Sequence, residues 1–267
     1  MYKIVAIDLD DTLLNDEGRV SEENRAVVGR AQQAGIKIVI VSGRSYASTK
    51  QYIRDLALSD LTVSLNGAYI QDPADDRLVA GFPVDKEIAR HIIKDIEPFH
   101  AHLNFYSGEK VYCQGKTEQA LMYARMNRIE IDYVDSLEEL SRKKAPGKLL
   151  INDEPAKLEK IKELLEKKYG DQVNIVFSKP YFLEITDKAA SKGAALLKVA
   201  EMYGIEPLDV IAIGDSENDL SMIRNAGLGI AMANAKEDIK RAADYVTLSN
   251  NESGVAYAIK KFIFNEI

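Results

Sequence analysis

The sequence predicts an α/β protein in which a Rossmann-like parallel sheet is interrupted by an inserted α+β domain. Short apolar runs with β-branched residues alternate with helical stretches towards both ends of the chain, which favours a parallel sheet with helices on both faces. This alternation breaks near Phe82, and several strands in the middle of the chain alternate apolar and polar residues. The length of 267 residues also exceeds the usual size of a single-core domain. We therefore expect a core domain at residues 1–82 and 190–267, and an inserted domain at residues 83–189.

The first part of the core domain is expected to alternate strands and helices. Ser21 can cap a helix that ends at Gly35, where a left-handed residue suits glycine. Asn66 and Gly67 predict a tight turn after a third strand. The expected elements are strands at residues 3–9, 36–41 and 61–65, a small hairpin at 12–20, and helices at 21–35 and after Arg44.

The inserted domain and the second part of the core domain complete this pattern. In the inserted domain we expect helices near 85–97, 116–127 and 155–169, and strands at 103–107, 148–152, 174–178 and 182–186. In the second part of the core we expect helices at 191–203, at 218–225 and at the end of the chain, with strands at 210–213, 228–232 and 245–248.

Composition excludes several classes of protein. The formal net charge of −7 argues against a nucleic-acid partner, and the run Arg142-Lys143-Lys144 is expected to be a solvated face. The single Cys113 excludes an internal disulfide and a Cys-based zinc site, so we expect a packed or half-buried thiol in a strand. No apolar run reaches the ~18 residues of a membrane-spanning helix, and the N-terminus meets Asp8 too early for a signal peptide. We expect a cytoplasmic protein without a membrane partner.

Four polar segments are each placed at the end of a predicted parallel strand or at the start of a helix. Ligands of open α/β sheets bind outside the carboxyl ends of the strands, so this fold would bring the four segments together. Each segment alone is a weak signal, and their combination in this order indicates a site. The segments are Asp8-Leu9-Asp10-Asp11-Thr12, Ser42-Gly43-Arg44, Ser191-Lys192-Gly193 and Gly214-Asp215-Ser216-Glu217-Asn218-Asp219.

The acidic residues of these segments indicate a metal ion. Two unit charges about 4 Å apart repel by about 1 kcal/mol in water and by about 4 kcal/mol at an effective dielectric constant of about 20, so a cluster of aspartates requires a cation. The candidate ligands are all oxygen atoms, which favours a hard ion, and Mg²⁺ is the expected cofactor. These acidic residues are Asp8, Asp10, Asp11, Asp215 and Asp219.

The remaining residues of the segments fit a phosphate group. Ser42 offers a hydroxyl group, Gly43 offers an unobstructed backbone N–H, and Lys192 offers a positive charge near the start of a helix. A phosphate dianion is repelled by a carboxylate, so the metal and Lys192 are needed for attack. Asp8 and Asp10 would share a face of a regular strand, so one could act as nucleophile and the other as proton donor.

In this order, the four segments resemble the haloacid dehalogenase (HAD) superfamily of phosphohydrolases. The length and position of the insert resemble its Cof-type branch, which carries a type IIB cap. The stretches 180–185, 214–219 and 226–232 are similar to bacterial sugar-phosphate phosphatases of that branch. The resemblance covers essentially the whole chain and is looser across residues 83–180.

The resemblance implies catalytic roles for three residues. Asp8 matches the nucleophile that forms an aspartyl-phosphate, and Asp10 matches the acid that protonates the leaving oxygen and then activates water. Lys192 matches the lysine that neutralises nucleophile and phosphate. One departure is Asp11, where the family often has glycine, so its side chain is expected either to crowd the loop or to point outward.

The resemblance also implies a phosphate site and a metal site. Ser42, at a position that is usually threonine, would bind the phosphoryl oxygens together with the backbone N–H groups of Leu9 and Gly43, and with Asn218. Asp215 would bind Mg²⁺ alongside a carboxylate oxygen of Asp8 and the backbone carbonyl of Asp10, and Asp219 would support the metal shell. Arg44 and Asn66 fall on loops that would face the substrate.

The expected function is a magnesium-dependent phosphatase of small phosphorylated metabolites, with sugar phosphates as the default substrate by resemblance. Phosphorylated cofactors such as pyridoxal phosphate or flavin mononucleotide, and simple phosphonate-like compounds, are alternatives. The insert is expected to act as a lid that chooses the leaving group, with Tyr181 and Phe182 as candidates, although Phe182 could equally be core.

Two other functions fit parts of the pattern. A phosphomutase-type phosphotransferase would share the core residues and would return an isomeric phosphate instead of inorganic phosphate. A signalling receiver domain also uses an acidic pair, a hydroxyl and a lysine. Receivers are about half this length, and the large insert and the 214–219 segment argue against that interpretation.

Overall fold

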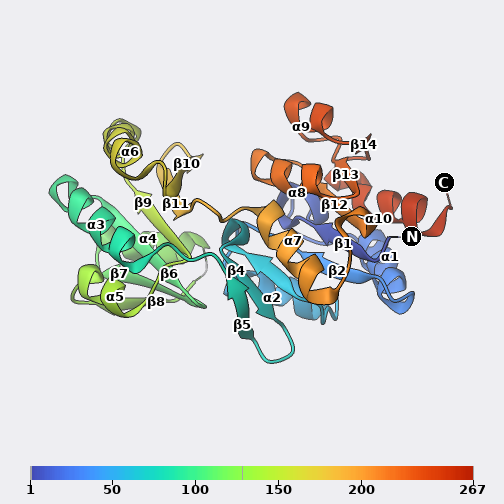
Figure 1. Ribbon diagram of the computed structural model, residues 1–267, viewed down its shortest axis with the longest axis horizontal. Helices are drawn as coiled ribbons and strands as arrows, with labels where there is room; N and C mark the ends of the chain where they lie inside the picture. Colours follow the sequence, from blue (N-terminus) through green and yellow to red (C-terminus); the bar gives the residue numbers. More distant parts are fainter. Residues whose placement is uncertain (1, 128, 267) are drawn as a thin grey trace. The chain divides into compact units, whose positions relative to one another are not determined.

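The chain folds into two compact units, which we call the core unit and the inserted unit. The core unit comprises Met1–Ala80 and Ser191–Ile267, and the inserted unit comprises Gly81–Ala190. The computed structural model describes residues 2–127 and 129–266 (Figure 1). No helix in this described part of the chain is long and apolar enough to cross a membrane.

A parallel sheet forms the centre of the core unit. The described strands have the order β14-β13-β12-β1-β2, and each neighbouring pair is parallel. All residues of β1 and β12 are buried, as expected for parallel strands covered on both faces. The strands are β1 (Ile4–Ile7), β2 (Lys37–Ile40), β12 (Val210–Gly214), β13 (Leu228–Ala231) and β14 (Tyr245–Val246).

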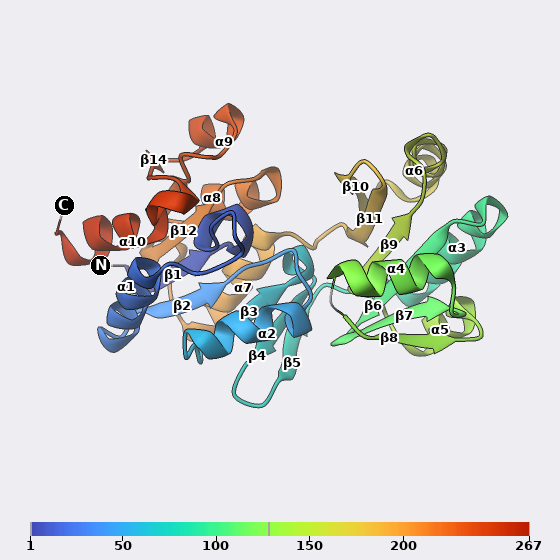
Figure 2. The ribbon, with the colours of Figure 1, turned by 180° about the vertical axis from the view of Figure 1, so that it is seen from behind.

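Helices cover both faces of this sheet. They are α1 (Glu22–Gln33), α2 (Tyr46–Asp55), α7 (Lys192–Tyr203), α8 (Leu220–Asn225), α9 (Glu237–Ala242) and α10 (Gly254–Ile259). Neighbouring side chains of a strand point to opposite faces, so Val5 and Ile7 pack with α1, α2 and α10, whereas Ile4 and Ala6 pack with α7 and α8. Helix α7 lies in front of the sheet in Figure 1 and α2 in front of it in Figure 2. The predicted parallel sheet with helices on both faces is confirmed.

Serine caps begin the two helices that flank the central strands. The hydroxyl oxygens of Ser21 and Ser191 each accept a hydrogen bond from the backbone N–H three residues further on, at 3.1 and 3.0 Å. Gly35 follows α1 with a φ of +81°, as its predicted role at the helix end requires. The cap at Ser191 makes Lys192 the first residue of α7, so its side chain starts from the helix N-terminus.

The third predicted strand meets the parallel sheet through an isolated parallel bridge and belongs to a second, smaller sheet. It corresponds to β3 (Thr62–Ser64), which pairs antiparallel with β4 (Tyr69–Asp72) in a smaller sheet that also contains β5 (Arg77–Gly81). An isolated parallel bridge between Val41 and Val63 connects β3 to the chain that follows β2.

The turn between β3 and β4 accounts for their antiparallel pairing. Leu65, Asn66 and Gly67 all have positive φ angles, so they reverse the chain and direct β4 back along β3. A Cβ atom at Gly67 would lie 2.2 Å from the carbonyl oxygen of Ser191. Only glycine fits there, and the tight turn predicted at Asn66-Gly67 is confirmed.

The inserted unit contains a mostly antiparallel sheet with helices packed against it. Its described strands have the order β10-β11-β9-β6-β7-β8, and β7 and β8 are parallel to one another. They are β6 (His102–Ser107), β7 (Lys110–Gln114), β8 (Ile131–Val134), β9 (Lys148–Asn152), β10 (Val173–Lys179) and β11 (Phe182–Asp187). The helices are α3 (Lys86–Ile96), α4 (Glu118–Asn127), α5 (Leu137–Lys143) and α6 (Pro155–Tyr169).

The hydrophobic core of the inserted unit lies on one face of this sheet. Leu103 and Phe105 of β6 pack there with apolar residues of α3, α5 and α6, such as Ile92 and Leu158. Strand β8 and helix α5 were not expected from the sequence. Helix α5 ends with Arg142 and Lys143, where cations favour the negative end of the helix dipole.

The opposite face of the same sheet carries polar and aromatic side chains. Cys113 of β7 is buried there as predicted, and its thiol donates to Asn104 Oδ1 at 3.1 Å. Burial raises the pKa of the Cys113 thiol to about 12. Phe182 is buried and its ring packs edge-on to Tyr123, whereas Tyr181 is 40% exposed. Of the two predicted specificity candidates, Phe182 is therefore a core residue.

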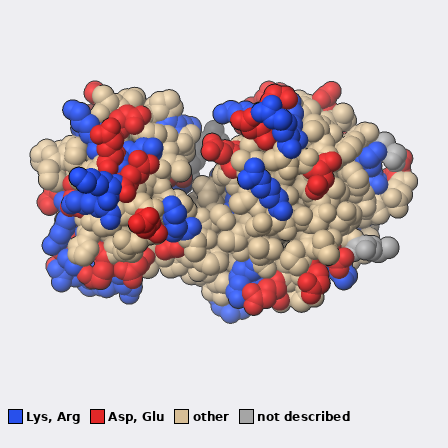
Figure 3. Space-filling view, turned by 45° about the horizontal axis from the view of Figure 1, so that its top comes forward, with Lys and Arg blue, Asp and Glu red and all other residues tan. Residues whose placement is uncertain are grey.

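Acidic and basic side chains are interspersed over both units on the face that Figure 3 shows. Exposed ion pairs of the two units include Lys110 with Asp132 at 2.6 Å and Lys198 with Glu201 at 2.9 Å. This arrangement agrees with the scattered lysines and arginines of the sequence.

Candidate active site

Three neighbouring strands of the parallel sheet place the polar segments at one edge. Asp8 follows β1, Ser42 follows β2 and Asp215 follows β12, and the carboxyl ends of parallel strands meet at the same edge. The backbone N–H of Asp8 donates to the carbonyl oxygen of Ile213 at 3.0 Å, so the ladder between β1 and β12 continues up to the site. The position of Asp8 is thus fixed by main-chain hydrogen bonds.

Lys192 lies between two aspartates at this edge. Its Nζ atom donates to Asp8 Oδ1 at 2.6 Å and to Asp219 Oδ1 at 2.5 Å. All three residues are at most 4% exposed. Burial raises the pKa of Asp8 well above its ordinary value, and Asp219 adds to this while Lys192 opposes it. Burial alone would lower the pKa of Lys192, but the carboxylates of Asp219 and Asp8 hold it above its ordinary value.

Asp219 also holds the turn that carries Asp215. Its Oδ2 atom accepts hydrogen bonds from the backbone N–H groups of Asp215 and Ser216, both at 3.0 Å, and from Ser216 Oγ at 3.1 Å. A Cβ atom at Gly214 would lie 2.5 Å from Asp219 Cβ, so this close approach requires glycine. Both carboxylate oxygens of Asp219 are therefore engaged by protein donors.

The carboxylate of Asp215 lies beside this buried cluster. Its Oδ1 atom accepts a hydrogen bond from Thr12 Oγ1 at 2.9 Å. Burial, together with the neighbouring Asp219, raises the pKa of Asp215 to about 6, against the lowering effect of the Thr12 hydroxyl. The sequence argument gave Thr12 no role of its own, although it belongs to the same segment as Asp8.

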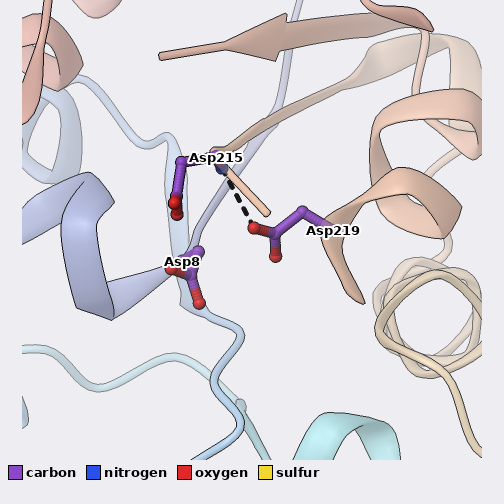
Figure 4. A group of neighbouring side chains, drawn as sticks. All are labelled: Asp8, Asp215 and Asp219. Carbon is purple, nitrogen blue, oxygen red and sulfur yellow. Dashed lines mark hydrogen bonds between the residues drawn. The ribbon is translucent and has the colours of Figure 1, made fainter. Parts of the chain in front are cut away.

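The acidic cluster can accommodate a metal ion. One carboxylate oxygen each of Asp8, Asp215 and Asp219 lie within 4.8 Å of one another, and Figure 4 shows the three side chains converging. The donor set consists of oxygen only, which fits a hard divalent cation. A cation would also offset the repulsion and the burial that raise the pKa values of Asp8 and Asp215.

A second group of residues lies together on the loops after β2, β3 and β12. The hydroxyl oxygen of the buried Ser42 accepts from the backbone N–H of Arg44 at 3.1 Å. Asn66 Oδ1 accepts from Asn218 Nδ2 at 2.9 Å, and a Cβ atom at Gly43 would come within 2.9 Å of the same Oδ1 atom. The structure thus brings Ser42, Gly43, Asn66 and Asn218 together, as a shared phosphate site would require.

Asp8 and Asp10 do not share a strand face, which corrects the geometric argument made from the sequence. Strand β1 ends at Ile7, and the chain then forms an irregular turn over Leu9–Leu13, in which Asp10 is extended and Asp11 is left-handed. The side chain of Asp8 is buried, whereas that of Asp10 is 52% exposed and meets Arg44. The left-handed Asp11 turns the chain away from the direction of β1.

Asp11 adopts the left-handed conformation, with a φ of +57°. This conformation explains why glycine suits the position, and the exposed Asp11 side chain does not crowd the loop. The side chain of Asn234 stabilises the turn by donating to the carbonyl oxygen of Asp11 at 2.8 Å. The sequence alone gave no signal for Asn234, because this contact joins segments far apart in the chain.

The fold and the site together define a class of protein: an α/β enzyme with a buried aspartate–lysine cluster at the carboxyl edge of a parallel sheet and an inserted α+β unit. A family model described as haloacid dehalogenase-like hydrolase matches residues 5–259. The chain therefore belongs to the haloacid dehalogenase-like hydrolases, which confirms the resemblance seen in the sequence.

Two relatives from Bacillus subtilis (strain 168) are similar over almost the whole chain. Phosphatase YwpJ is 33% identical, over 98% of this chain and 100% of its own. The 5-amino-6-(5-phospho-D-ribitylamino)uracil phosphatase YcsE is 32% identical, over 98% of this chain and 96% of its own.

Solved structures support the same fold. The crystal structure of TM0651 from Thermotoga maritima has a TM-score of 0.90 and 34% identity, over 98% of both chains. The HAD subclass IIB sugar phosphatase BT4131 has a TM-score of 0.81 and 25% identity, over 99% of this chain and 100% of its own. The predicted core with an inserted type IIB cap is confirmed as the fold class.

Proposed function

We propose that this protein is a magnesium-dependent phosphatase of small phosphorylated metabolites and that Asp8 is its nucleophile. The observation that carries the proposal is the buried Lys192, whose Nζ atom lies 2.6 Å from Asp8 and 2.5 Å from Asp219 while Asp215 adds a third carboxylate nearby. One cation among three carboxylates leaves the site short of positive charge. A divalent cation and a phosphate group would together complete it.

The reaction has two halves. In the first, an oxygen of Asp8 bonds to phosphorus, the bond from phosphorus to the leaving oxygen breaks, and Asp10 gives a proton to that oxygen. In the second, water attacks the aspartyl-phosphate and gives a proton to Asp10, which releases inorganic phosphate and restores Asp8. Lys192 offsets the charge on Asp8 throughout, which lets a phosphate dianion approach a carboxylate.

Phosphate binding is assigned to the segments around Ser42. The Ser42 hydroxyl and the backbone N–H groups of Leu9 and Gly43 would donate to the phosphoryl oxygens, and so would the side-chain amide of Asn218. The hydrogen bond between Asn66 and Asn218 supports this arrangement, because it ties the loop after β3 to the loop after β12. We therefore assign Asn66 to holding Asn218 in place.

The metal site is assigned to Asp8 and Asp215, with the backbone carbonyl of Asp10 as a third ligand. Bound Mg²⁺ would neutralise charge on the nucleophile and on the phosphate. Asp219 is assigned a supporting role, because one of its oxygens holds Lys192 and the other holds the turn at Asp215 and Ser216.

The substrate is proposed to carry its phosphate on a polyhydroxylated carbon chain. BT4131 is titled a sugar phosphatase, and the name of YcsE specifies a phosphorylated ribityl chain. Both compounds present a phosphate ester next to hydroxyl groups, so sugar phosphates and polyol phosphates share the chemistry that the site would recognise. We assign the choice between them to the inserted unit.

The test is phosphate release from a panel of hexose phosphates, a pentitol phosphate, flavin mononucleotide and pyridoxal phosphate. We expect the highest kcat/KM for a sugar or polyol phosphate, and Asp8→Asn should remove turnover while circular dichroism shows an intact fold. Substantial turnover by Asp8→Asn would contradict the nucleophile assignment. An isomeric phosphate without inorganic phosphate would instead identify a phosphomutase.

A further inference from the structure

The carboxylate of Asp10 accepts two hydrogen bonds from the guanidinium of Arg44. Arg44 Nε donates to Asp10 Oδ2 at 2.8 Å and Arg44 Nη2 donates to Asp10 Oδ1 at 2.5 Å. Such a two-pronged contact uses both carboxylate oxygens and fixes the plane of the carboxylate as well as its position. The same hydrogen bonds raise the pKa of the Arg44 guanidinium, so it stays charged.

Arg44 is itself held in place from three sides. Its backbone N–H donates to Ser42 Oγ at 3.1 Å, and its carbonyl oxygen accepts from the backbone N–H of Leu65 at 2.9 Å. The guanidinium carbon lies 5.5 Å from the ring centroid of Tyr52, which is a cation–π distance. The guanidinium is therefore a fixed partner for Asp10.

Asp10 lies outside the parallel sheet whose hydrogen bonds fix Asp8. It lies beyond the end of β1, it is followed by the left-handed Asp11, and its side chain is 52% exposed. An exposed aspartate can adopt several rotamers, yet an acid–base residue must lie within hydrogen-bond reach of the reacting oxygen. A second residue is needed to select the productive rotamer.

We propose that Arg44 is a positioning residue that aims the carboxyl group of Asp10 at the reacting oxygens. The inference rests on the phosphatase function proposed above, and it changes the role of Arg44 from binding substrate to orienting the acid–base residue. Binding a phosphate through the same two nitrogens would break both hydrogen bonds to Asp10, so the observed geometry favours the positioning role.

The test compares esters whose leaving groups differ in their need for a proton. p-Nitrophenolate leaves without protonation, whereas a sugar alkoxide does not. For Arg44→Met and Arg44→Lys we expect kcat on a sugar phosphate to fall about 10- to 100-fold, as for other small misplacements of a reacting group. The first-turnover burst of p-nitrophenolate and the KM for the sugar phosphate should each change less than about threefold.

A double-mutant cycle with Asp10→Asn shows whether Arg44 affects kcat through Asp10. The steady-state kcat on p-nitrophenyl phosphate still depends on Asp10, because water must be activated in the second half of the reaction. Arg44→Met should lower this kcat in the wild-type background and add no further loss to Asp10→Asn. An equal loss in both backgrounds, a raised KM for every ester alike, or an unchanged kcat in Arg44→Met would overturn the proposal.

Arg30 provides a matched control in the same unit. Its Nη1 and Nη2 atoms also donate to the two oxygens of one carboxylate, Glu266 Oε2 and Oε1, at 3.3 and 2.6 Å. Its guanidinium carbon also lies over an aromatic ring, 4.4 Å from the ring centroid of Phe264. It lies near the end of α1, just before β2 begins, and so at the sheet edge opposite the site. Arg30→Met should keep wild-type kinetics.

The same assay separates this inference from the proposed function. Loss of turnover in Asp8→Asn together with wild-type behaviour in Arg44→Met would contradict the positioning role alone. Turnover that survives in Asp8→Asn would contradict the phosphatase mechanism itself. Thermal unfolding of each variant shows whether a loss of kcat reflects loss of the fold.

Discussion

Each unit of this protein buries a lysine against at least one carboxylate, and the two groups differ in charge balance. In the core unit, Lys192 faces Asp8 and Asp219 while Asp215 lies close by, so three carboxylates share one cation. In the inserted unit, Lys148 Nζ pairs with one carboxylate among the residues that the structure describes, that of Glu184 at 3.0 Å, and it lies 5.0 Å from the ring centroid of Tyr106.

This difference teaches how to tell a functional ion cluster from a structural one. The Lys148–Glu184 pair is electrically complete, because one positive charge meets one negative charge and an aromatic face. The cluster around Lys192 is incomplete. Burial, and after it the neighbouring carboxylate of Asp219, raises the pKa values of Asp8 and Asp215. An incomplete buried cluster favours binding a further cation, which a balanced pair does not.

Removal of the metal should have the largest effect, because it leaves three carboxylates with Lys192 as their cation. Chelation with EDTA is expected to stop phosphate release, and added Mg²⁺ should restore it. Mg²⁺ at about 100 times its Kd should also raise the free energy of unfolding by about 2.7 kcal/mol, which denaturant titration can measure without any assay of activity. A fully active and demonstrably metal-free enzyme would contradict the comparison.

Replacement of Lys192 should have the second-largest effect on turnover. Lys192→Met is expected to lower kcat about 100- to 1,000-fold, as when one donor to the developing charge is removed, because Asp8 then repels the incoming phosphate. Lys148→Met is the matched control, since it removes an equally buried lysine from the other unit. Steady-state kinetics of the folded fraction should show a large loss for Lys192→Met only; equal losses would remove the distinction between the two clusters.

The balanced pair should matter for stability instead of turnover. Lys148→Met leaves Glu184 buried without a partner and is expected to cost about 3–5 kcal/mol of unfolding free energy. The double variant Lys148→Met with Glu184→Leu should recover most of this stability, because an apolar pair of similar volume replaces both charges. Urea unfolding measures the cost. A folded double variant with reduced kcat would show that the pair has a functional role after all.

The sequence predicted the site residues whose positions are set by the ends of strands. Asp8, Ser42 and Asp215 follow apolar runs that form strands of one parallel sheet, so their convergence follows from topology alone. Lys192 could be added because the sequence predicted a helix that begins at about residue 191. The expected fold class was predictable for the same reason, since β-branched runs and helix caps are local signals.

The sequence could not predict features that depend on backbone angles or on distant contacts. The premise that Asp8 and Asp10 share a strand face failed, because β1 ends at Ile7 and Asp11 turns through a left-handed conformation. The hydrogen bonds from Arg44 to Asp10 join two separate loops, and no periodic pattern in the sequence indicates them. In the inserted unit, β8 and α5 were missed because short elements carry too few residues for a clear pattern.

The smallest expected effect concerns the choice of substrate, which we assign to the inserted unit. Tyr181 is 40% exposed on this unit, whereas its neighbour Phe182 is buried against Tyr123. Tyr181→Ala should change the ratio of kcat/KM values between a sugar phosphate and flavin mononucleotide by up to about tenfold, with kcat for p-nitrophenyl phosphate unchanged. Phe182→Leu should keep the substrate ranking and cost less than about 1.5 kcal/mol of stability. An unaltered ranking in Tyr181→Ala would remove Tyr181 from the specificity residues and leave the assignment of the charged core site intact.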